Sequence, residues 1–388
     1  MTIARDKVDT RSENSRKRLL FVFGTRPEAI KLAPVITAFK GAGTWDIKIC
    51  VTAQHREMLD QVLTFFGITP DYDLDLMKKN QTLFAITADS LKGLEPVLRD
   101  AKPDILFVQG DTTSAFVGAL AGYYNQVKIA HIEAGLRSND KYSPFPEEMN
   151  RVLAGRLADY HFAPTESAAA NLRSEGITKN VWIVGNPVVD ALLTGLSIIR
   201  ERGEDAYAAF FHFVDFSKKI ILVTGHRRES FGRPFENICA ALSELTDRFD
   251  DIEIIYPVHL NPNVREPVNR IMGNRKRIHL IEPLEYPFLI WLMNRSYLII
   301  TDSGGVQEEA PSLGKPVLVM RDVTERTEGI DAGTARLVGT EKENILAHAE
   351  ELLTNVAAYS KMTRAVNPYG DGKTSMRIRN IMEDLAHA

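Results

Sequence analysis

The stretch TDSGGVQEEAPSLGKPVLVM, residues 301–320, decides the fold class, because its pattern is typical of a strand, a glycine turn, a helix and the next strand. Asp302 and Ser303 are residues that commonly cap helices. Gly304 and Gly305 let the backbone approach a ligand closely where the helix begins. Free N–H groups at such a helix start would face a pyrophosphate, so the stretch indicates a nucleotide site in an α/β protein.

Two carboxylates follow one turn into the expected helix. Glu308 and Glu309 cannot hold phosphate themselves, so the nucleotide interpretation makes them hydrogen-bond acceptors for ribose hydroxyls. The same pattern also fits an ordinary capped helix with surface acids, because short glycine motifs recur by chance.

Strand-like and helix-like segments alternate from about residue 18 nearly to the end of the chain, which predicts parallel sheets covered by helices on both faces. The first series of expected strands covers 18–23, 46–52, 104–109, 128–132, 160–163 and 181–184. The second series covers 218–224, 251–257, 277–281, 297–301 and 317–320. The sequence therefore predicts two doubly wound, Rossmann-like domains with an active-site cleft between them.

The two series divide at the turn signal GNP, residues 185–187, which precedes an expected helix at 188–200. The expected parts are a disordered N-terminal arm at 1–17, a first domain at 18–186, a second, nucleotide-binding domain at 187–373, and a C-terminal helix at 374–388 that packs back onto the first domain.

Composition excludes several classes of protein. The chain has 388 residues, 44% hydrophobic and 25% charged, which is enough for two buried cores. A net charge of −4 and a pI near 6.2 argue against a general nucleic-acid or anionic-membrane surface. No apolar run has the length of a signal-peptide core or a membrane span. We therefore expect a soluble, cytoplasmic protein with no nucleic-acid or membrane partner.

Metal and cofactor sites are also not expected. Cys50 and Cys239 lie far apart without zinc-type spacing, which indicates a reducing compartment. Asp71, Asp73 and Asp75 imitate a metal-binding pattern, but their alternation with apolar residues is typical of an edge strand. The sequence predicts neither a metal ion nor another cofactor.

Ligands bind beyond the carboxyl ends of the strands in open parallel sheets, so the residues that follow each strand are the candidate site. After the first expected strand, Thr25 and Glu28 have the spacing of a capping box. Arg26 stands at this helix start, where its charge opposes the helix dipole, and Lys31 follows about one turn later. An anion between the two cations would relieve that conflict; the alternative is an exposed basic pair.

Acidic residues recur at the same edge of the first sheet. Asp111 and Glu133 each follow an expected strand, and Glu147 precedes an expected helix in YSPFPEEMNR, residues 142–151. Singly, such acids are more often caps or ion-pair partners, but their recurrence favours catalytic groups. His226, after the first strand of the second series, is a candidate acid/base or phosphate-neutralising group from across the cleft.

Together these motifs resemble the non-hydrolysing UDP-N-acetylglucosamine 2-epimerases, whose fold is similar to that of the two-domain GT-B glycosyltransferases. The resemblance covers about residues 18–385. It is carried, in chain order, by FGTRPEAIKLAPV, VTAQHREMLDQV, QGDTTSAF, HIEAGLRS, PFPEEMNR, VGNPVVDAL, TGHRRESFG, TDSGGVQEEAPSLGKPVLVMRD and AGTARLVGT.

The resemblance implies reversible inversion at C2 of UDP-GlcNAc, which gives UDP-ManNAc for bacterial surface polysaccharides. UDP would leave by anti elimination, a 2-acetamidoglucal would stay in the cleft, and UDP would add back. The C2 proton is not acidic, so its removal must be coupled to departure of the pyrophosphate. Such chemistry needs a carboxylate base on one side of the sugar and cations with helix-end donors on the other.

Matched residue by residue, the resemblance implies acid/base roles for Asp111, Glu133 and Glu147, and a role for His226 at the leaving or returning phosphate; which carboxylate acts in which direction stays open. It implies binding of UDP or the substrate by Arg26, Lys31, Arg151, Ser303, Gly304, Gly305, Glu309 and Arg326. It also implies a homodimer and a second UDP-GlcNAc as activator, bound through Gln54, His55 and Arg56. Thr327 stands where the family usually has proline, and Leu289 where an aromatic residue is common.

Three rival functions stay open. A hydrolysing epimerase would release free ManNAc and UDP, and a GT-B transferase would pass the sugar to an acceptor. A non-catalytic sugar-nucleotide sensor would need the phosphate-binding residues but not Asp111, Glu133 and Glu147 together. The three acids in matched loops favour the non-hydrolysing epimerase.

Overall fold

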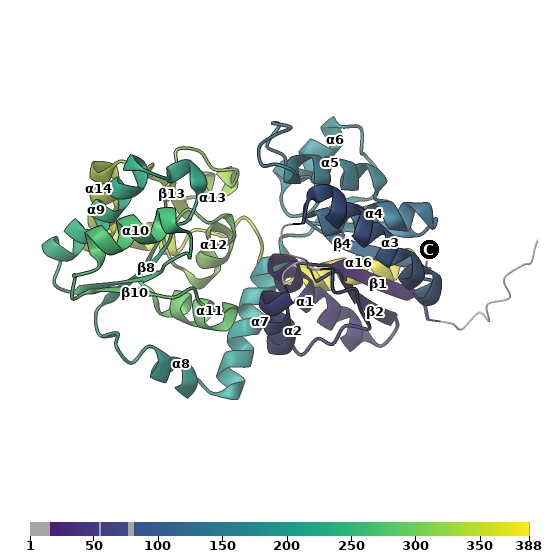
Figure 1. Ribbon diagram of the computed structural model, residues 1–388, viewed down its shortest axis with the longest axis horizontal. Coiled ribbons are helices and arrows are strands. Elements are labelled where there is room, and N and C mark those ends of the chain that lie inside the picture. The colour runs from purple at the N-terminus through teal and green to yellow at the C-terminus, as the bar shows by residue number, and fades with distance from the viewer. Residues whose placement is uncertain (1–15, 54–55, 77–80, 388) are drawn as a thin grey trace, which may run out of the picture.

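The structure is a computed structural model that describes residues 16–53, 56–76 and 81–387. It consists of two parallel sheets, each covered by helices, that lie side by side (Figure 1). The disordered arm expected at 1–17 falls almost entirely outside the described residues. The prediction of an α/β protein with two Rossmann-like domains is confirmed.

The first sheet has, in the described part of the chain, seven parallel strands in the order β3-β2-β1-β4-β5-β6-β7. They are β1 (Arg18–Phe23), β2 (Asp46–Val51), β3 (Tyr72–Asp73), β4 (Ile105–Gln109), β5 (Lys128–Ile132), β6 (Tyr160–Ala163) and β7 (Val181–Ile183). The helices between them are α1 (Arg26–Ala42), α2 (Arg56–Phe66), α3 (Leu83–Ala101), α4 (Thr113–Tyr124), α5 (Glu147–Leu157) and α6 (Glu166–Ser174).

The second sheet has six parallel strands among the described residues, in the order β10-β9-β8-β11-β12-β13. They are β8 (Lys219–Thr224), β9 (Ile252–Pro257), β10 (Ile278–Ile281), β11 (Leu298–Thr301), β12 (Val317–Val319) and β13 (Ala335–Leu337). The helices are α9 (Arg233–Arg248), α10 (Pro262–Met272), α11 (Tyr286–Arg295), α12 (Gly304–Glu309), α13 (Thr327–Asp331), α14 (Lys342–Thr354) and α15 (Val356–Thr363). The sequence did not predict β13.

Apolar runs explain why the central strands form. Residues 19–23 of β1 are fully buried, as expected for a strand covered on both faces. Phe21 stacks on Phe107 of β4 with ring centroids 4.7 Å apart, and Phe39 of α1 packs edge-on against both.

Within the described ranges, no helix combines the length and the apolar character needed to cross a membrane.

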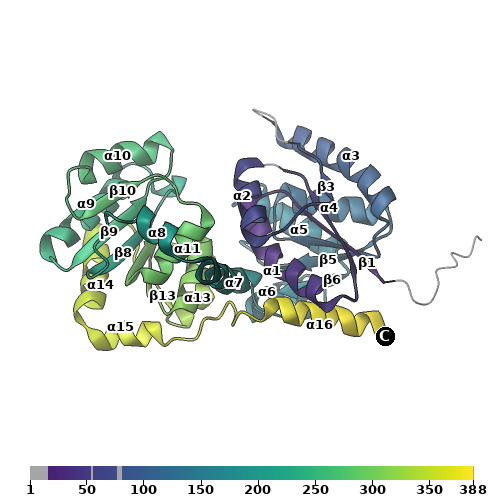
Figure 2. The ribbon, with the colours of Figure 1, turned by 90° about the horizontal axis from the view of Figure 1, so that it is seen from below.

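The chain crosses between the two sheets twice. The first crossing leads into α7 (Pro187–Arg202), which is followed by α8 (Asp205–Phe210). The second returns the chain from the second sheet to α16 (Thr374–His387), which packs against α1 and α7 beneath the first sheet (Figure 2). The crossings touch where the backbone N–H of Asn186 donates to the carbonyl of Tyr369 at 2.6 Å.

Candidate active site

Glu133 lies at the centre of the candidate site. It directly follows β5, it is buried, and its φ of +62° is a conformation that a non-glycine residue rarely adopts. Lys31 of α1 donates to both carboxylate oxygens, at 2.6 and 2.7 Å, and the Gln109 side chain donates as well. Burial alone would raise the pKa of Glu133, but the charge and hydrogen bond of Lys31, the Arg326 charge and the Asn186 hydrogen bond together outweigh it and lower the pKa below its usual range. Glu133 is therefore ionised at neutral pH.

A second buried carboxylate reaches the same place from the second domain. Glu308 of α12 accepts from Nε of Arg326 at 2.9 Å. The side-chain nitrogen of Asn186 bridges the two acids, at 2.8 Å from Glu133 and 2.9 Å from Glu308. Burial lowers the pKa of Lys31, but the Glu133 and Glu308 carboxylates outweigh it, so the Lys31 pKa is raised. The candidate site thus joins the domains through two buried carboxylates and two cations.

Asp111 follows β4 and is held by α5. Arg151 donates to Oδ2 of Asp111 at 2.5 Å, and the Asn150 amide donates to the Asp111 carbonyl at 2.9 Å. Arg151 also donates to Glu148 at 3.1 Å. This geometry places Arg151, expected to bind substrate, behind Asp111, where it fixes the direction of that carboxylate.

Glu147 is the first residue of α5. Its half-buried carboxylate forms no hydrogen bond or ion pair with any residue that the structure describes. The neighbouring Glu148 instead accepts from the backbone N–H groups of Ser138 and Asn139, at 3.0 and 3.1 Å. Glu148 is therefore a structural acid that orders the loop before α5, whereas the Glu147 carboxylate has no such contact among the described residues.

His226 follows β8 and is 47% exposed. Its Nδ1 lies 3.4 Å from Oδ1 of the buried Asp302, and its ring stacks on His259 with centroids 5.3 Å apart. Oδ2 of Asp302 accepts from the backbone N–H groups of His226 and Arg227, at 2.7 and 2.8 Å. Asp302 therefore holds the loop that presents His226.

The glycine turn after β11 leaves backbone accessible. Ser303 precedes α12, and a Cβ atom on Gly305 would meet nothing closer than 3.9 Å in the described structure. A Cβ on Gly304 would lie 3.2 Å from the guanidinium carbon of Arg326, so glycine there lets the Arg326 side chain pack on the turn. Burial lowers the pKa of Arg26, although the Glu309 charge opposes this. The turn and Arg326 of the second domain thus supply donors and positive charge, and Arg26 adds a cation from the start of α1 in the first domain.

Glu309 at the end of α12 is buried and accepts from the Tyr286 hydroxyl at 2.9 Å. Burial raises the pKa of Glu309 to about 7, and the nearby Glu308 carboxylate raises it further while Tyr286 opposes the shift. Glu309 therefore changes charge near neutral pH, unlike Glu133.

Of the residues expected to bind an activator, the structure describes Arg56. Arg56 begins α2 and forms ion pairs with Asp60, at 2.9 Å, and with Asp73 of the edge strand β3. Gln54 and His55 lie outside the described residues.

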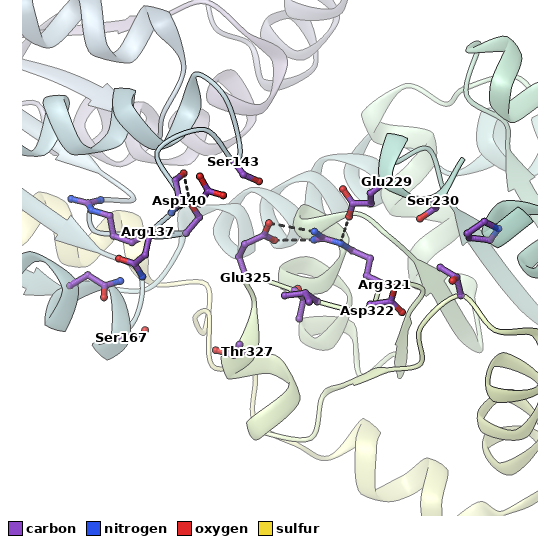
Figure 3. A pocket seen from close by; sticks show the side chains of 17 residues that line it. Arg137, Asp140, Ser143, Ser167, Glu229, Ser230, Arg321, Asp322, Glu325 and Thr327 are labelled. Atoms are coloured by element: carbon purple, nitrogen blue, oxygen red, sulfur yellow. Dashed lines mark hydrogen bonds and ion pairs between the residues drawn. The ribbon is translucent and has the colours of Figure 1, made fainter. Parts of the chain in front are cut away.

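A cavity of about 630 Å³ lies between the two domains (Figure 3). Its lining includes Glu325 and Thr327, on either side of Arg326 in sequence, but none of the candidate catalytic residues. Both of its arginines are already paired: Arg137 with Glu175 at 2.6 Å, and Arg321 with Glu229 and Glu325 at 2.8 and 2.9 Å. It is lined by Arg137, Ser138, Asn139, Asp140, Ser143, Ser167, Asn171, Glu229, Ser230, Pro234, Arg321, Asp322, Val323, Thr324, Glu325, Thr327 and Thr340.

Sequence reasoning did not identify three residues that build the site. Gln109 ends a strand, Asp302 resembles a simple cap, and Asn186 resembles an N-cap before proline. Asn186 is indeed the N-cap of α7, because its Oδ1 accepts from the N–H of Val188 at 3.1 Å. Its second function depends on its amide nitrogen, and no local pattern reveals where that atom points.

In the described part of the chain, no three His, Cys, Asp or Glu side chains are grouped to hold a metal ion.

Comparison with known proteins agrees with this architecture. The family model described as UDP-N-acetylglucosamine 2-epimerase matches residues 37–383. The UDP-N-acetylglucosamine 2-epimerase of Escherichia coli K12 is 54% identical over 372 residues, which cover 95% of this chain and 98% of the relative.

Solved structures show the same similarity. The UDP-GlcNAc 2-epimerase of Neisseria meningitidis, solved bound to UDP-GlcNAc, is 47% identical with a TM-score of 0.88 and covers 95% of this chain and 100% of its own. That of Methanocaldococcus jannaschii, solved with UDP-GlcNAc and UDP, is 36% identical with a TM-score of 0.78 and covers 94% and 99%. The paired sheets, the motifs that follow their strands, and these similarities together show that the chain belongs to the UDP-N-acetylglucosamine 2-epimerase family.

Proposed function

We propose that this protein interconverts UDP-GlcNAc and UDP-ManNAc without net hydrolysis, and so supplies ManNAc units for a bacterial surface polysaccharide. The observation that carries the proposal is the division of the candidate site. Asp111, Glu133 and Glu147 follow β4 and β5 or begin α5 on the first domain, whereas the turn at Ser303 and the Arg326 guanidinium belong to the second. A sugar nucleotide between them would meet bases at its C2 and donors at its diphosphate.

The proposed reaction is an anti elimination followed by re-addition. A carboxylate takes the C2 proton, the C1–O bond breaks, and its electron pair leaves with UDP while a C1=C2 double bond forms. The resulting 2-acetamidoglucal stays in the cleft. UDP then adds to C1, and C2 takes a proton on the opposite face, which inverts that carbon.

On the first domain, Asp111, Glu133 and Glu147 are the proposed acid/base groups. Lys31 keeps Glu133 ionised through the contacts at 2.6 and 2.7 Å, and Arg151 orients Asp111. Each acid therefore has its own surroundings, as different roles in the two directions require.

The second domain would hold UDP, with Arg26 at the start of α1 in the first domain as an additional cation. Ser303, Gly304 and Gly305 offer backbone donors, Arg26 and Arg326 supply positive charge, and His226 assists at the leaving or returning phosphate. Ionised Glu309 would accept hydrogen bonds from the ribose hydroxyls. A second UDP-GlcNAc that activates the enzyme through Arg56 and its neighbours, and a homodimer, belong to the same proposal.

Proton NMR after incubation with UDP-GlcNAc tests the function. We expect UDP-ManNAc, and in D₂O the product should carry deuterium at C2. Free ManNAc with UDP would instead identify a hydrolysing epimerase, and an unchanged spectrum would favour a sugar-nucleotide sensor. Product that retains its original C2 proton over many turnovers would contradict solvent-exchanging acid/base chemistry.

A further inference from the structure

Asn186 occupies the place where the two domains and both chain crossings meet. Its side chain is only 1% exposed. Its Oδ1 caps α7 through the N–H of Val188, and its backbone N–H donates to the carbonyl of Tyr369 on the returning crossing. The position of Asn186 is therefore tied to the backbone of both connections.

Its amide nitrogen carries two hydrogens, and each has a carboxylate to accept it. One acceptor is Glu133 of the first domain, at 2.8 Å, and the other is Glu308 of the second, at 2.9 Å. An amide nitrogen has no third hydrogen, so these contacts use its full donor capacity. Only a relative placement of the domains that brings both carboxylates to this nitrogen satisfies both donors.

Glu308 continues the connection toward the substrate. It accepts from Nε of Arg326 at 2.9 Å, and the proposed function places Arg326 on the diphosphate. An ordered series of contacts thus runs from the diphosphate side through Arg326, Glu308 and Asn186 to Glu133. Buried amide-to-carboxylate hydrogen bonds are directional, so displacement of one member is felt by the next.

We propose that Asn186 is a positioning residue that couples closure of the two domains to the orientation and ionisation of Glu133; this inference rests on the proposed function of Glu133 as an acid/base group. When the domains close, Glu308 and Glu133 share one donor nitrogen, and Glu133 is held as a carboxylate directed at the cleft. When Glu308 withdraws, the amide loses one of its two acceptors, and the nitrogen that bonds Glu133 is no longer held between the two carboxylates.

The Gln109 side chain also donates to Glu133, and other charged groups face that carboxylate. They are Lys31 from α1, Arg326 before α13, Glu308 from α12 and His131 on β5. Burial lowers the pKa of His131 to about 4, so its ring is neutral at physiological pH. Because Asn186 bonds the ionised form of Glu133, its loss should raise the pKa of Glu133 even with the cations still present.

The test distinguishes the function of the Asn186 amide nitrogen, which bonds Glu133 and Glu308, from the function of its Oδ1, which caps α7. Serine and aspartate are both good N-cap residues, so Asn186→Ser and Asn186→Asp keep an oxygen for the Val188 N–H. Asn186→Ser removes the bridging nitrogen, and Asn186→Asp places a third carboxylate between two others. The matched control is Asn367→Ala, because the Asn367 amide donates to the Glu308 carbonyl at 2.9 Å and to the Ser312 hydroxyl at 2.6 Å, and to neither carboxylate.

We expect kcat for UDP-GlcNAc to fall about tenfold in Asn186→Ser and about a hundredfold in Asn186→Asp, since the acid/base group is misplaced or protonated. The acidic limb of the kcat–pH profile should move up by about one pH unit or more, further for the aspartate variant, because a like charge disfavours ionisation. The acidic limb of the kcat–pH profile of the Asn367→Ala variant should stay at its wild-type position. The affinity for UDP, measured by calorimetry, should change less than about twofold in all three variants.

A direct measurement keeps this inference independent of turnover. The infrared carboxylate band of Glu133, identified by its loss in Glu133→Gln, should titrate at higher pH in both Asn186 variants than in the wild type. The proposal would be overturned if folded Asn186→Ser and Asn186→Asp kept both the wild-type infrared titration of Glu133 and the wild-type acidic limb of the kcat–pH profile. Asn186 would then be only the N-cap of α7. Failure of the wild type to form UDP-ManNAc would overturn the proposed function, and the infrared result would still decide whether Asn186 controls Glu133.

Discussion

At the scale of single residues, the groups around two buried glutamates decide whether each is ionised at neutral pH. Burial raises the pKa of both Glu133 and Glu309, but only Glu133 has a cation in direct contact, Lys31 at 2.6 Å. Glu133 is consequently held ionised, whereas the pKa of Glu309 rises to about 7. Removing one partner of such a buried pair would leave an uncompensated charge, so Lys31 and Glu133 act as a unit.

Asp111→Asn tests chemistry apart from binding. The amide keeps the shape and some hydrogen bonding but cannot exchange the proton, so kcat should fall by about a hundredfold or more. UDP affinity should change little, because Asp111 is a proposed acid/base group and not one of the proposed diphosphate or ribose ligands. Steady-state rates and calorimetry check both values, with Asp100→Asn as a control, since Asp100 bonds the Tyr72 hydroxyl on the exposed surface. Lost UDP binding with normal turnover at saturation would make Asp111 a ligand-positioning residue.

Glu309 should make sugar-nucleotide binding depend on pH. Only the ionised carboxylate can accept from two ribose hydroxyls, and the pKa of about 7 means that this form is lost as pH falls through 7. UDP-GlcNAc should therefore bind about tenfold more weakly at pH 6 than at pH 8. Calorimetry in an Asp111→Asn background measures this without turnover. Glu309→Gln should flatten the dependence; an equally steep dependence in that variant would point to another group.

At the scale of elements, helix starts organise the site. The side chain of Glu28 closes the capping box of α1: it accepts from the N–H groups of Gly24 and Thr25, at 3.0 and 2.8 Å. It also accepts from the Thr112 hydroxyl at 2.6 Å, which ties α1 to the start of α4. One buried acid thus fixes the relative position of the two loops that carry Arg26 and Asp111.

Glu28→Ala should lower the free energy of unfolding by about 1–3 kcal/mol, because one buried and two partly buried donors lose their acceptor. KM for UDP-GlcNAc should rise with it, since Arg26 begins the same helix. Glu28→Gln should largely restore both values, as glutamine also suits a capping box. Urea unfolding and kinetics measure the effects. Asn355→Ala, which removes the cap of α15, should cost stability but leave KM unchanged; a KM increase there would mean that any lost cap disturbs the site.

Gly305→Val should block the diphosphate without disturbing the fold. The nearest atoms to a Cβ at this position are 3.9 Å away, so the protein itself has room for a side chain. A β-branched side chain would stand where a phosphate oxygen must approach the backbone, and UDP affinity should fall at least about tenfold. Calorimetry and thermal melting separate the effects, with Gly41→Val, in open space on α1, as the control. Unchanged UDP affinity would remove the turn from the phosphate site.

At the scale of the whole molecule, two chain crossings join the domains in a tight space. Gly185 has a φ of +94°, and a Cβ there would lie 2.6 Å from the Thr374 hydroxyl and 3.3 Å from Gly370. Glycine is therefore required by the approach of one crossing to the other. Asn186, next in sequence, lies at this junction, so relative motion of the domains acts directly on its contacts.

Activation by a second UDP-GlcNAc would involve the whole molecule, because that ligand would have to favour one relative placement of the two domains over another. Purified UDP-ManNAc alone should turn over slowly until a trace of UDP-GlcNAc is added. Arg56→Ala should weaken that response while leaving the maximal rate at high UDP-GlcNAc nearly unchanged. Progress curves from each nucleotide sugar measure it, and Arg99→Ala, which removes an exposed pair with Glu95, is the matched control. Full activity on UDP-ManNAc alone would exclude activation.

The sequence by itself determined the fold class, eleven of the strands near their observed bounds, and the positions that follow those strands. These features depend on periodicity, caps and turns, which neighbours within a few residues specify. Only the tertiary structure decided which side chains meet. Lys31 pairs with Glu133 across 102 positions of sequence, and Asn186 reaches Glu308 across 122. Such contacts follow from how strand ends converge and how two sheets are placed together, which no local pattern specifies.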